Sequence, residues 1–487
     1  MDAPVPLIAV ALLAAAALVA PGERLRAWAM LLALALAPAI LIADIADTEQ
    51  LASLRDHPAL AAALAGAGIA VIAALALAFG RRAGALPVAA VATLPFRVPV
   101  VAGGTTANLL VPLYVVVGAG VLAHALPIIT GRTKGGSGAR RPGALEWALA
   151  LAVVLYAVQA ISSDDFERAL GNVVFFLVPF TLLYALISRV DWTPGLVRAC
   201  VVVLVVLAVA LAAVGFVEYA TRHLFLNPKV IASNQLEDYF RVNSLFFDPN
   251  IFGRFLAVVM LLVAAWLLWA RSRTQALGAI AILAVLWGGL VITLSQSSFA
   301  SLLVGLAVLG GLRWRARWAL AGVLAAVVVA VTLVAVAPTT LRVDLGDARS
   351  ADSATSGRYD LIAGGVRLFT EQPLTGQGSG SFAREYRRAE DVSAQRATSA
   401  SHTTPVTVAA EQGALGLAAY LALVVLALVR VLGGARVGPA RAALAAAFIA
   451  LLAHTMMYAA FLEDPLSWAL LGVATALAAA ARPGAGP

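Results

Sequence analysis

The stretch CVVVLVVLAVALAAVGFV, residues 200–217, decides the fold class of this chain. These 18 residues carry no charged side chain, and a helix of that length rises about 27 Å, close to the thickness of a bilayer's hydrocarbon core. Backbone N–H and C=O groups find no water in lipid, so a stretch that crosses it must be helical. Similar runs recur along all 487 residues. The sequence therefore predicts an all-α, polytopic membrane protein.

The composition supports this fold class and excludes a soluble enzyme. The chain is 62% hydrophobic and 12% charged, which is roughly half the usual charged fraction. The apolar runs predict about 14–15 transmembrane helices. The predicted spans are residues 4–20, 27–46, 59–79, 84–102, 107–130, 144–160, 169–188, 197–219, 251–270, 276–294, 297–312, 316–337, 405–429, 442–461 and 465–481.

Charge placement predicts the orientation of the helices. If alternate connections are assigned to alternate sides, nearly all basic residues of the short connections fall on one side, and the other side has only Arg55 and Arg168. Basic connections are cytoplasmic in most membrane proteins, so we expect the C-terminus inside and the long loops 220–250 and 338–404 outside. The net charge of +8 is then explained by basic residues on the cytoplasmic connections. These residues form no continuous stripe that would bind nucleic acid.

The first candidate site lies at the end of loop 220–250. Arg241, Asn250 and Arg254 fall in the short stretch 239–254, around the turn Asp248-Pro-Asn250. Ionisable groups at membrane depth are costly and are usually functional. The alternative is a capped helix start with interfacial aromatic residues.

The second candidate is loop 338–404, in which eight arginines are balanced by eight carboxylates. Its segment 356–373 predicts a short interfacial helix with Tyr359, Ile362, Val366 and Phe369 on one stripe and Arg358 at its start. Arginine suits a diphosphate because its planar fork binds oxyanions through two N–H groups. The alternative for any single arginine here is a structural salt bridge. The following Gly376-Gln-Gly-Ser-Gly-Ser381 lacks the Lys of a P-loop and predicts a tight turn.

The third candidate joins this loop to the next span through Ser401-His-Thr-Thr-Pro405. Thr404 is a suitable N-cap and Pro405 a suitable first helical residue, so His402 should lie just before a helix N-terminus. The positive end of that helix disfavours imidazolium and keeps the ring able to accept a proton. Glu411, inside the span, is a buried carboxylate that needs a partner. The alternative for His402 is an interfacial residue without a catalytic role.

These pieces, taken in order, resemble the O-antigen ligase and O-antigen polymerase family of bacterial envelope glycan enzymes. The similarity covers roughly residues 200 to 470. The matching pieces are Arg241–Asn250, Thr293–Ser298, Ser356–Arg358, Pro373–Gly378 with Phe382, Ser401-His402, and Glu411–Gly413 with Gly416. We accordingly predict N-terminal transmembrane helices over residues 1–190 and an O-antigen ligase-like transmembrane core over 191–487.

The resemblance implies a glycosyltransferase that needs no metal and no cofactor and works on the outer face of the bacterial cytoplasmic membrane. Its partners would be membrane lipid, an undecaprenyl-diphosphate-linked oligosaccharide donor, and a glycan or glycolipid acceptor. His402 would be the base and Arg358 would bind the diphosphate. Further candidate residues are Arg241, Arg254, Asn250 and Arg367 for donor binding, with Glu411 and Ser401 in support.

The sequence departs from the family at one helix start. Ligases commonly carry an essential arginine in a Ser-Arg-Gly motif where this chain has Ser295-Gln-Ser-Ser298. Arg241 or Arg254 would have to supply that charge, and ligase and polymerase both stay open. Arg97, in the predicted span 84–102, has no motif-based role. A secondary transporter is the main alternative function, although the polar residues collect at span ends rather than at the midplane. A non-catalytic envelope scaffold is a further alternative.

Overall fold

A computed structural model describes residues 4–44, 56–102, 105–132, 141–226, 230–231, 234, 240–314, 358–390 and 400–481. Helices dominate the first half of the chain, where one β-hairpin interrupts them. The elements are α1 (Pro4–Val19), α2 (Glu23–Asp44), α4 (Pro58–Arg81), α5 (Ala85–Thr93), β1 (Val98–Ala102), β2 (Thr105–Leu109), α6 (Val111–Ile129), α7 (Ala144–Gln159), the 3₁₀ turn η1 (Ala160–Ser162), α8 (Phe166–Asn172), the π-helical turn η2 (Val173–Leu177), α9 (Val178–Ile187) and α10 (Pro194–Thr221).

The second half contains the helices α12 (Pro249–Leu268), α13 (Arg273–Thr293), α14 (Gln296–Arg313), α18 (Arg358–Glu371), α19 (Phe382–Glu390), α20 (Thr404–Leu432), α21 (Pro439–Thr455) and α22 (Pro465–Ala480). Ten helical segments of the described chain are long and apolar enough to cross a membrane, and three shorter apolar helices accompany them. The prediction of an all-α, polytopic membrane protein is confirmed. The short helix predicted in segment 356–373 is α18, and a second short helix, α19, follows it in loop 338–404.

The predicted span 84–102 is wrong. The helix ends at Thr93, and the chain enters an antiparallel hairpin in which Val98 of β1 pairs with Leu109 of β2. Two prolines explain the break, because Pro95 and Pro99 each lack the N–H that a continuous helix needs. The predicted span 316–337 lies outside the described residues.

Several helices begin at a polar cap followed by proline. The side chains of Thr193, Asp248 and Asp464 each accept a hydrogen bond from a backbone N–H of the first turn, which satisfies a donor that the helix leaves unpaired. Thr404, the predicted cap of α20, is instead its first residue, and Thr403 is the N-cap. Their hydroxyls donate to carbonyls at the end of α21, and the Thr403 side chain accepts no backbone N–H of α20.

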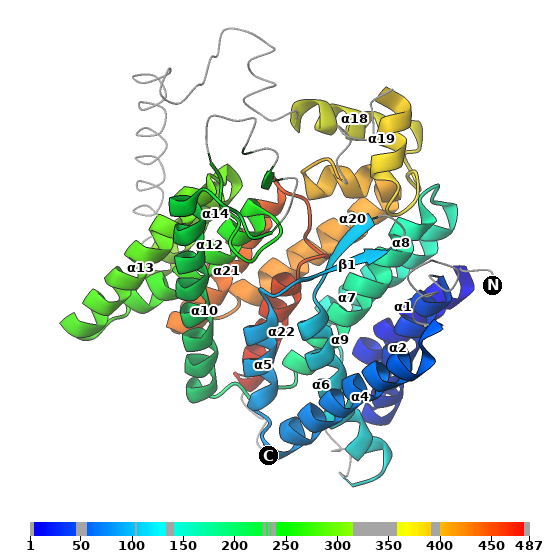
Figure 1. Cartoon of the computed structure of the whole chain (residues 1–487), viewed down its shortest axis with the longest axis horizontal. Helices are drawn as coiled ribbons and strands as arrows, with labels where there is room; N and C mark the ends of the chain where they lie inside the picture. The colour runs from blue at the N-terminus through cyan, green and yellow to red at the C-terminus, as the bar shows by residue number, and fades with distance from the viewer. Residues whose placement is uncertain are drawn as a thin grey trace.

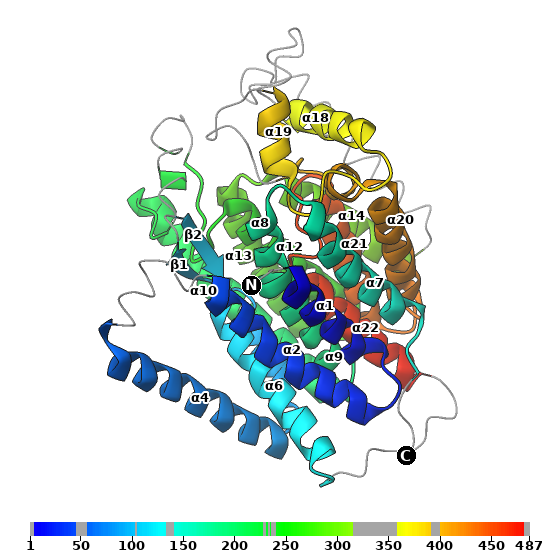
Figure 2. The same cartoon turned by 90° about the vertical axis from the view of Figure 1, so that its right-hand side faces the viewer.

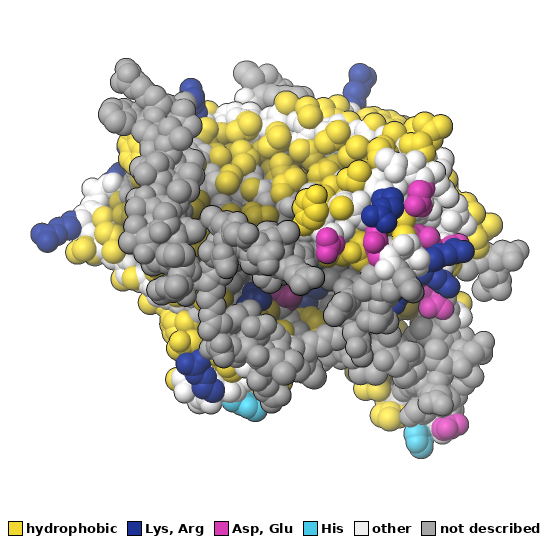
Figure 3. Space-filling model, turned by 90° about the horizontal axis from the view of Figure 1, so that it is seen from above, with side chains coloured by type: hydrophobic (Ala, Val, Ile, Leu, Met, Phe, Trp, Pro, Cys, Tyr) yellow, Lys and Arg dark blue, Asp and Glu magenta, His cyan; other side chains and the backbone are white. Residues whose placement is uncertain are grey.

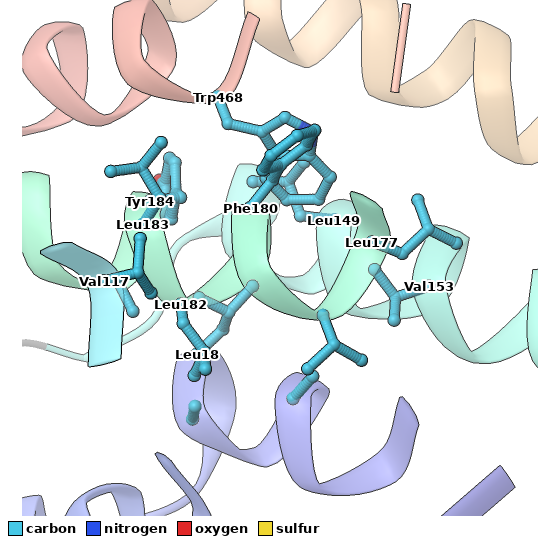
Figure 4. Packing of buried hydrophobic residues seen from close by; sticks show 14 of the residues in the cluster. Leu18, Val117, Leu149, Val153, Leu177, Phe180, Leu182, Leu183, Tyr184 and Trp468 are labelled. Atoms are coloured by element: carbon cyan, nitrogen blue, oxygen red, sulfur yellow. The ribbon is translucent and has the colours of Figure 1, made fainter. Parts of the chain in front are cut away.

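The helices form one bundle with α18 and α19 lying across one end, at the top of Figure 1. We call this the upper end. One hydrophobic cluster joins the first helices to the last ones, since α7 packs against α20 and α9 against α22. Figure 4 shows Phe180 of α9 and Leu149 of α7 beside Trp468 of α22. A second cluster is built mainly by α10, α12, α13, α14 and α21. In Figure 2, α4 lies at the edge of the bundle.

Helix α18 packs on the bundle through a different face from the predicted stripe. Tyr359 is 72% exposed and Val366 is 49% exposed, whereas Leu361 and Leu368 are buried. The difference arises from Gly364 and its neighbour Gly365, where added Cβ atoms would press on Tyr386 and Val406. The face with the two adjacent glycines therefore lets the backbone of α18 approach its neighbours more closely than the face with the apolar stripe would.

The loop between α18 and α19 runs through a narrow gap between α20 and η1. At Gly378, with φ of 98°, a Cβ would overlap the backbone of Ser163. On the other side α20 has a non-helical residue, Gly413, whose φ of 63° lets the chain pass Leu374. Only glycine adopts these angles without strain at such close range. The predicted tight turn at residues 376–381 is confirmed, and it approaches another helix.

We expect Gly378→Ala to destabilise the protein strongly, because the added methyl group has no space and the backbone angle is unfavourable. Gly66→Ala is the matched control, since a Cβ at Gly66 of α4 meets nothing within 4 Å and alanine favours helix over glycine by about 1 kcal/mol. Unfolding temperature in detergent, with the elution profile on size exclusion, measures both. Equal unfolding temperatures for the two variants would contradict this packing.

Candidate active site

Polar and charged groups gather at the upper end of the bundle, where α12, α14, α20 and α22 begin. Figure 3 views this end from above and shows acidic and basic side chains in a depression near its middle. The N-termini of these helices carry partial positive charge, so the end as a whole favours anions. The candidate residues make different contacts at this end.

Arg241 and Asn250 are brought together by the start of α14. The Asn250 side-chain oxygen accepts hydrogen bonds from Arg241 Nη2 at 3.2 Å and from Ser295 Oγ at 2.8 Å. Arg241 Nε donates to the Thr293 carbonyl at 3.1 Å. Ser295 is the N-cap of α14. Arg241 therefore lies against the start of α14.

The serines of that helix start leave no room for a longer side chain. Ser298 is fully buried, and a Cβ at Gly253 would lie 2.6 Å from Ser298 Oγ. Ser297 Oγ lies 3.1 Å from Nε2 of the buried His454. The departure from the Ser-Arg-Gly motif is thus part of a close-packed contact between α12, α14 and α21. The positive charge beside it comes from Arg241.

Arg254 forms a buried ion pair with a residue that the sequence analysis did not single out. Its Nη2 lies 2.8 Å from Asp464 Oδ2, and both side chains are 3% exposed. Asp464 Oδ1 also accepts the Leu466 N–H at the start of α22. Within the part of the chain that the structure describes, Arg254 Nε and Nη1 have no hydrogen-bond partner. Arg254 therefore keeps two guanidinium nitrogens whose N–H groups can serve a ligand.

Three further charged side chains surround this ion pair. Arg97 interacts electrostatically with both Asp464 and Arg254. Burial raises the pKa of the Glu463 carboxyl, while the positive charges of Arg168 and Arg97 lower it. The signal for this group was present in the sequence as Glu463-Asp464-Pro465, an acidic pair between two apolar spans. The role of this acidic pair could not be predicted from the sequence, because the residues that contact it lie far away along the chain.

His402 lies at the turn just before α20. Its φ of 63° is uncommon for a residue other than glycine. The turn is held by the buried Ser401, whose hydroxyl lies 2.9 Å from both the Thr403 carbonyl and the Thr407 hydroxyl. The supporting role predicted for Ser401 stays a prediction. Strain of this kind persists where neighbouring contacts determine the backbone.

Tyr458 links His402 to the first turn of α12. Its ring centroid lies 6.1 Å from that of His402 and 5.8 Å from that of His454. Burial and the negative charge of the nearby Asp248 raise the pKa of Tyr458, so the phenol stays protonated. Asp248 in turn caps α12. Tyr458 was not identified from the sequence, since a single tyrosine after an apolar run carries no pattern.

Glu411 is partnered by backbone, as a buried carboxylate requires. Its Oε2 accepts the Gly380 N–H at 2.8 Å and its Oε1 accepts the Phe382 N–H at 3.2 Å. These bonds fasten the glycine loop and the start of α19 to α20. Glu411 therefore supports the site by holding the α18–α19 segment on the bundle.

Comparison with known proteins assigns this region to a family. Residues 281–421 match the O-antigen ligase family. We call this stretch the O-antigen ligase segment. The resemblance predicted from the sequence is confirmed over residues 281–421, and the chain is a membrane protein with a segment similar to O-antigen ligases. No curated protein matches the chain.

The O-antigen ligase segment contains only part of the cluster. His402, Glu411 and the serines that begin α14 lie within it. Arg241 and Arg254 precede it and Asp464 follows it, so the rest of the chain contributes most of the charges that surround the ion pair. Among the described residues no group of three or more His, Cys, Asp or Glu side chains is placed to hold a metal ion.

The two remaining arginines among the predicted site residues belong to α18. Arg367 is half-exposed and pairs with Glu390 of α19 at 2.9 Å, the salt bridge that the sequence analysis left open for arginines in this loop. Arg358 is the first residue of α18, but its side chain lies outside the described part. The structure thus assembles Arg241, Asn250, Arg254 and His402 around one end, with α18 lying across it.

We expect Asp464→Asn to lower the unfolding temperature, because it leaves the Arg254 guanidinium buried without a counter-charge, at a cost of about 3–5 kcal/mol. Asparagine still caps a helix, so the α22 cap is kept. The double variant Arg254→Met with Asp464→Asn should recover most of the lost stability. If the double variant is no more stable than Asp464→Asn alone, the ion pair does not carry this effect.

Proposed function

We propose that this protein is a glycosyltransferase that moves a glycan from an undecaprenyl-diphosphate donor to an acceptor hydroxyl on the outer face of the cytoplasmic membrane. The observation that carries the proposal is the assembly of Arg241, Arg254 and His402 at one end of the bundle, next to and within the O-antigen ligase segment. Ligase and polymerase share this chemistry and differ in the acceptor.

The arginines would bind and stabilise the leaving group. In the transfer the bond between the sugar carbon and the diphosphate oxygen breaks, and both bonding electrons leave with the diphosphate. Guanidinium groups hold such charge well because they stay ionised and offer paired N–H donors. Arg254 has two buried donors available, and Arg241 lies beside the starts of α12 and α14. Arg358 and Arg367 on α18 are proposed to approach the donor from above.

His402 would take the proton of the acceptor. As the acceptor oxygen bonds to the sugar carbon, its hydroxyl proton passes to the imidazole. The start of α20 favours the neutral ring that this step needs. The ring of Tyr458 lies beside that of His402, with 6.1 Å between the ring centroids. Because the diphosphate is a good leaving group, a base and positive charge suffice, and we propose that no metal is required.

The orientation of the protein belongs to the same proposal. We place the upper end outside the cell and the C-terminus in the cytoplasm, since a glycan on undecaprenyl diphosphate is transferred after it has crossed the membrane. The excess of basic residues on the connections at the opposite end supports this orientation. A secondary transporter, the alternative function, would not require a donor site confined to one side.

Reactivity of introduced cysteines tests the orientation. The native Cys200 is buried, so the background is low. We expect Gln372→Cys, exposed between α18 and α19, to react with a membrane-impermeant maleimide on intact cells. Thr274→Cys, exposed at the start of α13, should react only after the membrane is permeabilised. The reverse pattern would overturn the proposed orientation.

Transfer by purified protein tests the function. The full chain in detergent is given lipid-linked oligosaccharide and candidate acceptors, with a chelator and without nucleotide. We expect transfer, with His402→Ala slowing it by about 100-fold or more and Arg358→Ala strongly reducing it. His57→Ala, at an exposed position before α4, is the matched control and should be unaffected.

Three outcomes of this experiment would count against the proposal. Normal turnover by folded His402→Ala would remove the base assignment. Complete loss of transfer in the chelator, restored by added metal, would remove the metal-independent mechanism. An absence of transfer with every acceptor, together with solute uptake in proteoliposomes, would favour the transporter.

A further inference from the structure

The connection between α20 and α21 is strongly basic. Helices α20 and α22 begin at the upper end and α21 ends there, so this connection lies at the opposite end of the bundle, which we call the lower end. Residues 430–441 contain Arg430, Arg436 and Arg441 and no acidic residue. The candidate active site lies at the other end of these helices, so the proposed function gives the three arginines no role.

Two of these arginines line one pocket. Arg430 and Arg441 face an open pocket of about 200 Å³ between the last turns of α20 and α22 and the first turn of α21. The other lining residues are apolar and include Val431, Leu444 and Leu477. A small polar group that enters this pocket would therefore meet guanidinium groups on an apolar background.

Arg441 is held in the pocket by backbone on two sides. Its Nη2 donates to the Leu477 carbonyl in the last turn of α22 at 2.6 Å. Gly434 has a φ of 74°, and a Cβ there would lie 2.6 Å from Arg441 Nη1, so the glycine leaves the space that the guanidinium occupies. The contact with Leu477 by itself would only cap the end of α22. It engages one nitrogen of the planar fork.

Arg430 brings a second guanidinium group to the same pocket. Its Nη2 lies 3.9 Å from Glu146 Oε2 of α7, which is longer than a hydrogen bond. Glu146 is engaged elsewhere, because its Oε1 accepts the Tyr184 hydroxyl at 3.0 Å and its Oε2 accepts the Gly143 N–H at 2.9 Å. The Arg430 side chain is only 16% exposed. One carboxylate thus faces two guanidinium groups, and the pocket keeps a net positive charge.

The surroundings favour a lipid headgroup over a soluble anion. Val429, Leu432 and Val437, which flank the lining residues in sequence, are exposed apolar side chains. An acyl chain covers such a surface in a bilayer, whereas a soluble anion gains nothing from it. A zwitterionic headgroup is disfavoured, because its ammonium would lie among arginines without an acidic residue in the connection. Basic pockets between transmembrane helices are known to bind anionic lipid headgroups.

We propose that Arg430 and Arg441 bind the phosphate of an anionic phospholipid, whose acyl chains lie along the exposed face of α20. Glu146 positions Arg430 and the Leu477 carbonyl positions Arg441, so the site depends on α7, α20, α21 and α22 together. A phosphate offers several oxygens to two planar forks. The bound lipid fastens the last three helices to one another at the end opposite to the candidate active site.

Native mass spectrometry of the full chain in detergent tests the inference by resolving each bound lipid. The dissociation constant of the first bound lipid is measured for phosphatidylglycerol and for phosphatidylcholine with the same acyl chains. We expect the natural chain to bind phosphatidylglycerol about ten-fold more tightly. Arg430→Gln and Arg441→Gln should each lose most of this preference, because charge-assisted hydrogen bonds are lost.

Matched variants separate a lipid site from surface charge and from a structural role. Arg271→Gln removes an exposed arginine at the lower end, between α12 and α13, and should leave phosphatidylglycerol binding unchanged. Arg441→Lys keeps the charge without the planar fork and should bind several-fold more weakly. Phosphatidylglycerol should raise the unfolding temperature of the natural chain but not that of Arg441→Gln. If Arg441 only capped α22, the lipid would raise both temperatures equally.

Several results would overturn the inference. One is an equal affinity for phosphatidylglycerol in the natural chain and in folded Arg430→Gln and Arg441→Gln. Another is an equal weakening by Arg271→Gln, which would show that general surface charge attracts the lipid. Displacement of phosphatidylglycerol by the same concentration of glycerol 3-phosphate would assign the pocket to a soluble anion. If Arg441→Gln does not fold, unchanged affinity in Arg441→Lys overturns the inference instead.

Discussion

The buried ion pair between Arg254 and Asp464 sets the arrangement of the upper end of this bundle. An unpaired charge in an apolar interior is so costly that the two helices that carry these residues, α12 and α22, must keep a fixed spacing there. Asp464 also caps α22, which ties the ion pair to the direction of that helix. The neighbouring Arg241, Tyr458 and Arg97 lie around this fixed point.

The loop between α18 and α19 is fastened to the upper end through hydrogen bonds from its backbone. Glu411 accepts two backbone N–H groups from the loop that precedes α19, and glycine allows the loop to pass between α20 and η1. The result is a pair of amphipathic helices, α18 and α19, held across the top of a hydrophobic bundle. Their position follows from the hydrogen bonds at a single carboxylate.

The early and late parts of the chain share one interior. Helices α7 and α9 pack against α20 and α22, and Arg97 interacts with Asp464. The predicted boundary at residue 190 stays a prediction, but helices from both sides of it pack into one hydrophobic cluster. The O-antigen ligase segment alone holds neither member of the central ion pair.

The sequence by itself determined the class of the fold, most of the spans and the family. These follow from a local rule, because each helix that crosses lipid must satisfy its own backbone and show a long apolar run. The one clear error in the spans, residues 84–102, came from reading apolar length while discounting Pro95 and Pro99. The prediction that the apolar stripe of α18 faces the bundle was wrong for a related reason. Gly364 and its neighbour add nothing to a pattern of apolar side chains, but they decide which face of the helix packs on the bundle.

Among the candidate residues, His402, Arg241, Asn250 and Arg254 were visible as polar residues against an apolar background. Their partners were not, because Asp464 and Tyr458 lie some 200 residues away from Arg254 and Asp248 in sequence, and no spacing rule connects them. Only the tertiary structure decided which helix ends meet. A charge buried in an apolar bundle accepts whichever counter-charge the packing brings to it, and that packing depends on the shapes of all the helices together.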